Sequence, residues 1–246
     1  MLTATWTSFS PSTHGSWIVA HRGASARHRE SSAEAFEDAI ADGANAVETD
    51  VRRSQDGVFV CHHDETLKRS AGLDTALSAL PFDELQRVAP DYAVRLEDVL
   101  ERVRGRCNIL LDLKLTDAAD ICSLVGLLAS HRADDSIAIG VRSLEIQAQI
   151  RQLNPDLVQL ALLGTTEQVP QFVTAGGAWL RLWERDATEA QIEATRALGV
   201  PVLVMVGGPG TDRAIGDIGT TQAGALLERG VAGLMLNDPR VARLAP

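Results

Sequence analysis

The sequence lacks any run of lysine or arginine, and its net charge is strongly negative. Its 246 residues include 23 basic and 33 acidic side chains, which gives a formal net charge of −10. Such a chain is a poor match for the phosphate backbone of nucleic acids or for an anionic membrane surface. We therefore expect neither as a partner.

Long apolar segments are also missing. No stretch of 18 apolar residues occurs, and residues 1–16 are polar, without the apolar core of a secretion signal. The three cysteines, Cys61, Cys107 and Cys122, are odd in number and lack the spacing of a metal site. We predict reduced thiols in the core of a cytoplasmic protein, with no stable membrane insertion.

Two widespread catalytic motifs are absent as well. The sequence has no G-x-S-x-G, the turn that presents a nucleophilic serine. The glycine-rich segment GGPGTDR at residues 207–213 has neither the Lys-Ser/Thr of a P-loop nor the spacing of a dinucleotide fingerprint. We interpret this segment as a loop and as a candidate for the rim of a site.

The sequence does contain an alternation of β-rich apolar runs and amphipathic segments. In the first amphipathic segment, Ala35, Phe36, Ala39 and Ile40 fall on one helical face. Several segments end in the glycine that often closes a helix, namely Gly43, Gly105, Gly176, Gly199 and Gly230. The apolar runs lie at residues 17–21, 45–51, 108–115, 136–141, 156–163, 178–183, 200–206 and 231–237.

Eight strands alternating with helices, about 30 residues per unit, predict a (β/α)8 TIM barrel of the α/β class. An open doubly wound sheet is the alternative, because periodicity alone does not exclude it. Residues 56–72 follow the second strand before any helix begins, so we predict an excursion above the carboxyl end of the barrel. No linker interrupts the chain. We expect one barrel domain at residues 17–246, preceded by a tail at residues 1–16.

Two acids lie inside the second predicted strand, AVETDV. Side chains alternate along a strand, so Glu48 and Asp50 share one face and lie about 7 Å apart. Two buried like charges repel each other and lose hydration, so a cation or strong hydrogen bonds must hold them. The alternative is an exposed edge strand with solvated acids.

The predicted strand at residues 108–115 repeats this pattern, with Leu110, Asp112 and Lys114 on one face. Asp112 would complete an all-oxygen site, and three carboxylates suit Mg²⁺ or Ca²⁺ better than zinc. The alternative is that Asp112 and Lys114 only pair with each other.

Histidines lie near two of these strand ends. AHRG places His21 and Arg22 at the end of the first strand, and CHHD places His62 and His63 on the excursion. A lone histidine at a strand end is more often structural than catalytic. Two imidazoles beside a carboxylate cluster are able to act as base and acid in one bond cleavage, and Arg22 is able to bind a phosphate or carboxylate.

These segments resemble the glycerophosphodiester phosphodiesterase family. Its members share a His-Arg-Gly, a Pro-Glu-Asn-Thr box, a Glu-x-Asp strand and a following His-Asp. The corresponding segments of this sequence have the same order and spacing, and they are IVAHRGAS and RESSAEAFEDAIADGANAVETDVRRSQDGVFVCHHDETLKRS. VRLEDVL, LDLK and GVAGLMLNDP resemble later family segments more weakly. The resemblance covers nearly the whole chain from residue 17.

The resemblance implies a role for each matched residue. His21 and His63 match the paired acid/base histidines, and His63 is preferred to His62 because it directly precedes Asp64. Arg22 matches a phosphate-binding arginine and Lys114 a lysine near the phosphate.

The resemblance also implies that Glu48, Asp50 and Asp112 are ligands of a divalent cation, Mg²⁺ or Ca²⁺. Asp112 is one methylene shorter than the family's usual glutamate. In the RESS segment, residues 29–32, only Glu30 of the family box is kept, while serines remain to cap the helix. LVMVGG, residues 203–208, lacks the tryptophan often found on the seventh strand.

The activity that the resemblance implies is hydrolysis of a glycerophosphodiester, a small molecule, to sn-glycerol 3-phosphate and an alcohol. The alternatives are a lysophospholipase D-like activity and an inactive barrel that only binds phosphodiesters or metal. The two retained histidines argue against the inactive barrel, because binding alone needs no proton shuttle.

Overall fold

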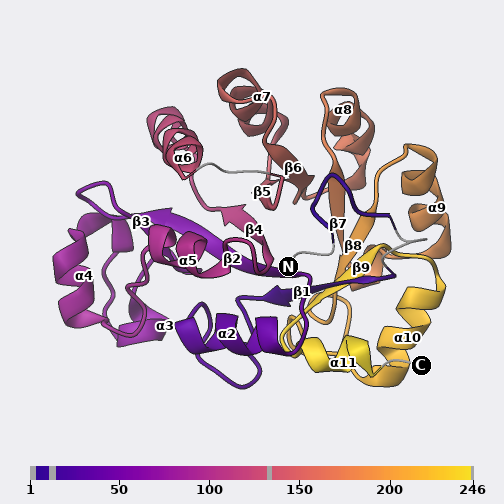
Figure 1. The fold of residues 1–246 in the computed structure, drawn as a ribbon, viewed down its shortest axis with the longest axis horizontal. Helices are drawn as coiled ribbons and strands as arrows, with labels where there is room; N and C mark the ends of the chain where they lie inside the picture. The colour runs from indigo at the N-terminus through magenta and orange to yellow at the C-terminus, as the bar shows by residue number, and fades with distance from the viewer. Residues whose placement is uncertain (1–3, 11–14, 132–134, 245–246) are drawn as a thin grey trace.

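A computed structural model describes residues 4–10, 15–131 and 135–244 of the chain (Figure 1). Within these residues, eight parallel strands pair side by side, and pairing of the first with the second closes the ring. The sheet is therefore a closed TIM barrel, and the open-sheet alternative is wrong. The barrel strands are β1 (Trp17–His21), β2 (Ala46–Arg53), β4 (Asn108–Leu113), β5 (Ile137–Val141), β6 (Val158–Ala161), β7 (Trp179–Trp183), β8 (Val202–Met205) and β9 (Gly233–Leu236).

Helices lie around the outside of this barrel (Figure 1). The α-helices are α2 (Ala33–Ala41), α3 (Lys68–Ala71), α4 (Phe82–Val88), α5 (Leu96–Val103), α6 (Ala118–Ser130), α7 (Leu144–Leu153), α8 (Val169–Thr174), α9 (Glu189–Ala197), α10 (Thr220–Glu228) and α11 (Pro239–Arg243). Short 3-10 turns occur at η1 (Leu77–Ala79), η2 (Thr166–Gln168) and η3 (Glu184–Asp186). No described helix is long and apolar enough to cross a membrane.

The predicted excursion is present after β2. Strand β3 (Phe59–Cys61) turns back and pairs antiparallel with the end of β2, with Val51 opposite Cys61. The chain then continues through α3, η1 and α4. These elements have a small apolar core of their own, which includes Val60, Leu77 and Phe82. The excursion is thus a packed addition at the carboxyl end of β2.

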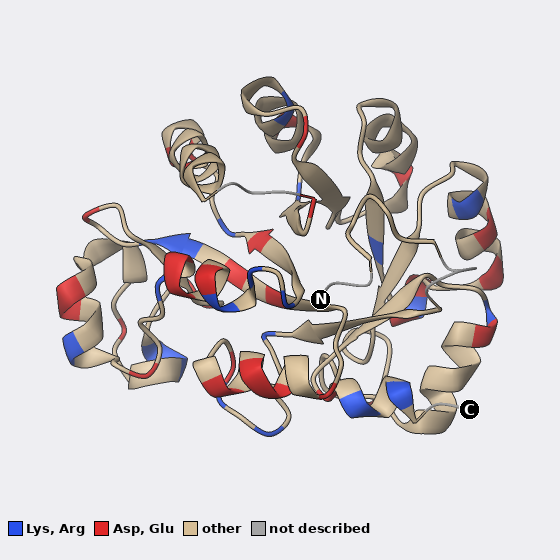
Figure 2. Cartoon of the chain, viewed as in Figure 1, with Lys and Arg blue, Asp and Glu red and all other residues tan. Residues whose placement is uncertain are grey.

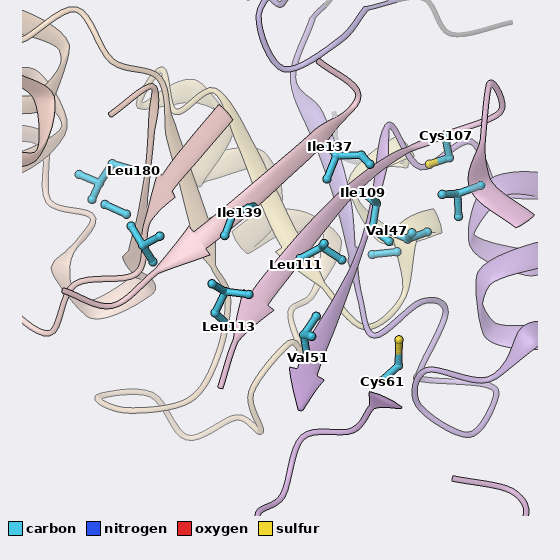
Figure 3. Close-up of a cluster of buried hydrophobic side chains, with 14 of the residues drawn as sticks. Val47, Val51, Cys61, Cys107, Ile109, Leu111, Leu113, Ile137, Ile139 and Leu180 are labelled. Carbon is cyan, nitrogen blue, oxygen red and sulfur yellow. The ribbon is translucent and has the colours of Figure 1, made fainter. Parts of the chain in front are cut away.

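The main core lies between the outer face of the sheet and the helices. Val47 of β2, Ile109 and Leu111 of β4 and Ile139 of β5 belong to one apolar layer (Figure 3). Burying a side chain of this size contributes about 1.5–3 kcal/mol. Alternate residues of the same strands point into the barrel, which is how one strand serves both the core and the site.

The amino-terminal end of the barrel is closed by tryptophans. Trp6 packs edge-on against Trp17 and Trp179, with ring centroids 4.6 and 5.2 Å away. Its indole N–H donates to the Ser136 carbonyl at 3.0 Å, and the Trp179 indole N–H donates to the Trp6 carbonyl at 2.8 Å. Residues 4–10, within the predicted tail, therefore lie against the floor of the barrel.

The first helix begins and ends where its serines and glycine predict. Ser32 caps α2 by accepting the Ala35 N–H at 3.1 Å, as its serines predicted. Gly43 then ends that helix with φ 81°, a left-handed conformation that suits glycine.

All three cysteines are free, but only Cys61 and Cys107 are buried. The prediction that Cys122 lies in the core is wrong, because it falls on the solvent face of α6.

Candidate active site

Three carboxylates meet inside the barrel at the carboxyl ends of β2 and β4. Glu48, Asp50 and Asp112 are 3%, 1% and 9% exposed, and one oxygen from each lies within 4.8 Å of the others. Asp50 and Asp112 are opposite each other in the strand register. Figure 2 shows acidic segments on strands β2 and β4. The alternative of a solvated edge strand is wrong, because β2 is paired on both sides.

The electrostatics of this cluster favour a bound cation. Burial, together with the nearby carboxylates of Asp50 and Asp112, raises the pKa of Glu48 well above its usual value. Burial also acts on Asp50, but Lys114 and Arg22 outweigh it and hold the pKa of Asp50 below its usual value. Three hard oxygen donors close together, with Glu48 resisting ionisation in the absence of a further cation, fit a divalent metal ion.

Two cations bind the β4 side of the cluster. The Lys114 Nζ lies 2.9 Å from Asp50 Oδ1 and 2.8 Å from Asp112 Oδ2. The Arg142 Nε donates to Asp112 Oδ1 at 3.1 Å. Lys114 therefore pairs with Asp112, but Lys114 also pairs with Asp50 and Asp112 also belongs to the carboxylate cluster, so the alternative that these two residues only pair with each other is wrong.

Arg22 holds the other side of the cluster in a strained backbone conformation. Its φ of 56° is rare for a residue with a side chain. This conformation lets its backbone N–H donate to Glu48 Oε2 at 3.0 Å, while its Nε lies 3.1 Å from Asp50 Oδ2 and its Nη1 2.9 Å from Glu30 Oε2. Burial opposes ionisation, but Asp50 and Glu48 outweigh it and raise the pKa of Arg22.

His21 is held by a residue of the last strand end. Its Nδ1 lies 2.9 Å from Asn237 Oδ1. The Asn237 amide nitrogen donates to the Ile215 carbonyl at 2.8 Å and to Asp217 at 2.9 Å, which fixes its oxygen toward the histidine. An oxygen accepts, so Nδ1 carries the proton and Nε2 keeps a lone pair. Burial and then Arg22 lower the pKa of His21 to about 4.

The two histidines of the excursion have different surroundings. His63 lines the same cavity as His21, and its Nδ1 is 2.7 Å from Asp64 Oδ1. Burial acts on Asp64 too, but hydrogen bonds from His63 and Arg69 hold its pKa at about 2. His62 is buried elsewhere, edge-on to Tyr92 with ring centroids 6.2 Å apart. The family resemblance selects His63 over His62 because His63 directly precedes Asp64, and of the two only His63 lines the cavity.

All seven candidate residues line one cavity of about 290 Å³. Its other wall is largely apolar and contains Trp183, Met205 and Met235. Arg181 of β7 also lines the cavity. Sequence reasoning missed four residues of the site, Arg142, Arg181, Trp183 and Asn237.

Comparison with known proteins identifies the family of this chain. Residues 21–203 match the Glycerophosphoryl diester phosphodiesterase family, which is more than half of the chain. The chain belongs to this family. Among curated members, mouse Lysophospholipase D GDPD3 is 39% identical over 156 residues, covering 57% of this chain and 47% of that protein. The Glycerophosphodiester phosphodiesterase of Bacillus altitudinis is 30% identical over 111 residues, covering 41% and 45%. The chain thus matches about half the length of these relatives.

Solved structures of family members share the fold. A putative family enzyme from Galdieria sulphuraria superposes with a TM-score of 0.78 at 19% identity, covering 94% of this chain and 98% of that one. An Oleispira antarctica phosphodiesterase, solved with the product sn-glycerol-3-phosphate, gives a TM-score of 0.76 at 19% identity, covering 93% and 96%. At these identities the similarity establishes the TIM barrel.

Proposed function

We propose that this family member is a metal-dependent phosphodiesterase that hydrolyses glycerophosphodiesters to sn-glycerol 3-phosphate and an alcohol. One observation carries the proposal: three buried carboxylates within 4.8 Å of one another share a cavity with two histidines. The names of the relatives, and the product bound to the Oleispira antarctica enzyme, support the same reaction.

The proposed cation is Mg²⁺ or Ca²⁺, held by Glu48, Asp50 and Asp112, because all three ligands are hard oxygens. A divalent cation supplies Lewis acidity that draws charge off phosphoryl oxygens. Arg22 and Lys114 lie beside the cluster and are proposed to bind the same oxygens. Their carboxylate partners keep both side chains oriented toward this wall of the cavity.

The surroundings of the two histidines support different roles. His21 is neutral near pH 7 because burial and Arg22 lower its pKa to about 4, and its free Nε2 is able to accept a proton from the attacking oxygen. That oxygen belongs to water or to the substrate's own glycerol 2-hydroxyl. We assign His63, oriented by Asp64, to protonate the leaving alkoxide.

A second candidate is a lysophospholipase D activity on lysophospholipids. Two observations favour it: the name of the mouse relative, and the apolar wall formed by Met205, Ile215 and Met235, which suits an alkyl group.

The three free thiols support a reducing compartment, so we place the activity in the cytoplasm on a small-molecule substrate.

The test is an assay of the purified protein with several glycerophosphodiesters and with a lysophospholipid, with and without a chelator. We expect metal-dependent release of sn-glycerol 3-phosphate from the diesters. Faster release of the head group from the lysophospholipid would select the second candidate. No turnover of any substrate with Mg²⁺ or Ca²⁺ would contradict both candidates and leave the binding-only barrel.

A further inference from the structure

Arg181 lies on the wall of the barrel opposite the carboxylate cluster. Around the closed ring, three strands separate β7 from β2 in either direction. Trp179 and Trp183 share the inner face of β7 with Arg181, while Leu180 and Leu182 belong to the outer core. The guanidinium of Arg181 therefore faces the cavity across from the proposed metal site.

Among the cations that line the cavity, Arg181 is the exception. Arg22, Lys114 and Arg142 each pair with a carboxylate of the cluster. Arg181 is only 7% exposed, and within the described part of the chain it has no carboxylate within 4 Å. Its Nη1 is buried without a hydrogen-bond partner.

Burying a charge without a partner lowers the stability of the folded state. Burial, and to a lesser degree the nearby Arg142, lower the pKa of Arg181 to about 10, which still leaves it charged at pH 7. Asp112, Glu48 and Asp186 influence it only from a distance. The guanidinium carbon lies 4.4 Å from the centroid of the Trp183 ring, an arrangement that fixes its plane. A fixed, unpaired guanidinium is prepared to bind an oxyanion through two N–H groups.

The distribution of charge in the cavity indicates which oxyanion would bind to Arg181. Arg22 and Lys114 already lie beside the cluster on the β2 and β4 wall, where the single negative charge of the scissile phosphodiester is bound under the proposed function. Arg181 is on the other side, where the rest of the substrate extends. Its partner is therefore a second anion of the same substrate.

We propose that Arg181 is a specificity-determining residue that binds an anionic group, a carboxylate or a phosphate, carried by the alcohol of the glycerophosphodiester. The inference rests on the proposed function for the position of the scissile group. It implies a preference for acidic head groups over neutral ones and selection against cationic head groups, which would meet a buried positive charge.

The experiment compares three glycerol phosphodiesters of similar size, in which the alcohol is glycolate, ethylene glycol or ethanolamine. These head groups are anionic, neutral and cationic. A charge-assisted hydrogen-bond pair predicts that kcat/KM for the glycolate diester exceeds that for the neutral diester by about 10- to 100-fold. The ethanolamine diester is expected to be the slowest. A fourth diester with a phosphate-terminated alcohol shows whether carboxylate or phosphate is preferred.

Arg181→Gln should remove most of this preference, because kcat/KM should fall further for the glycolate diester than for the neutral one. Arg181→Lys should keep part of the preference, because lysine keeps the positive charge but lacks the two parallel N–H donors of the guanidinium. Arg185→Gln is the matched control: this half-exposed arginine lies four residues further on, outside the cavity, and its loss should leave the preference intact. Mg²⁺ affinity, measured by calorimetry, should be equal in all variants.

Two results would overturn the proposal. One is a wild-type enzyme that hydrolyses the three diesters equally well. The other is an Arg181→Gln variant that loses the same factor on all three, which would assign Arg181 to the scissile phosphoryl group. If the wild-type enzyme hydrolyses none of them, the proposed function fails, and calorimetric binding of the same diesters decides the inference. Tighter binding of the glycolate diester would support it, and equal binding would refute it.

Discussion

The two ends of the barrel are built from the same strands and have opposite chemistry. At the amino-terminal end, Trp6, Trp17 and Trp179 form a dry aromatic floor. Two to four residues further along, the same inward positions carry His21 on β1 and Arg181 on β7. One or two steps of two residues, about 7 Å each, thus separate the side chains that close the barrel from those that line the cavity.

This difference teaches that stability and function are separable in this fold. The floor excludes water and buries large aromatic area, which stabilises the folded state. The mouth collects buried charge, which costs stability and is retained for chemistry. Substitutions at the mouth should therefore change activity more than stability, and substitutions at the floor should do the reverse.

The largest effect is expected at the carboxylate cluster. Chelation should abolish activity, and Mg²⁺ or Ca²⁺ should restore it. Glu48→Gln keeps the shape of the side chain and removes one ligand charge, so like chelation it should lower turnover by about 10⁴-fold or more, equivalent to about 5.4 kcal/mol. The unfolding free energy of the chelated variant should not fall, because one of three crowded carboxylates is gone. Turnover assays and chemical denaturation measure the two effects.

Glu101→Gln is the control for this change, because Glu101 is exposed on α5. Its turnover should equal that of the wild type. Full activity after exhaustive chelation would contradict the metal site.

The next largest effect is expected at the histidines. A general acid or base contributes about 10² to 10⁴ in rate, so His21→Ala and His63→Ala should each lower turnover within that range. The double variant should lose less than the product of the single losses, because the groups act on one reaction. Metal affinity should hardly change. His62→Ala is the neighbouring control, and a loss there as large as at His63 would contradict the assignment.

Much of this arrangement could be predicted from the alternation of residues along single strands. The eight strands, the inward pair Glu48 and Asp50, and Asp112 on the same face all follow from a period of two. Arg181 could have been found by the same rule, because a charge lies between two tryptophans in AWLRLW just as Glu48 lies in AVETDV.

Other residues could not be found in this way. Asn237 meets His21 only because the last strand pairs with the first, and no local pattern encodes that closure. Trp6 lies in a polar segment, and it is buried because it packs against Trp17 and Trp179 at the floor of the barrel. The helix that carries Cys122 is apolar on average, so its solvent face was not distinguishable by composition.

At the floor, we expect a loss of stability without loss of chemistry. Trp6→Ala removes a buried indole and its hydrogen bonds, so it should lower the unfolding free energy by about 3–5 kcal/mol. Turnover measured well below the new melting temperature should stay within about threefold, because no cavity residue contacts Trp6 through a hydrogen bond. Trp6→Phe should recover about half of the loss. A variant of unchanged stability would show that the floor does not depend on this segment.

The smallest effect is expected at a structural residue of the mouth. Ser32 lies at the carboxyl end of the barrel, close in sequence to Glu30, yet its hydroxyl interacts within the first turn of α2, accepting the Ala35 N–H and bonding to Glu34. Loss of an N-cap costs about 1 kcal/mol, so Ser32→Ala should lower the unfolding free energy by that amount and leave kcat and KM unchanged. Ser32→Asp, which keeps an accepting oxygen and adds a charge favourable at a helix start, should restore the stability. A loss of turnover in Ser32→Ala larger than about threefold, with the helix intact, would mean that the cap also positions Arg22 through Glu30. Structural and catalytic residues would then not be separable at this end of the barrel.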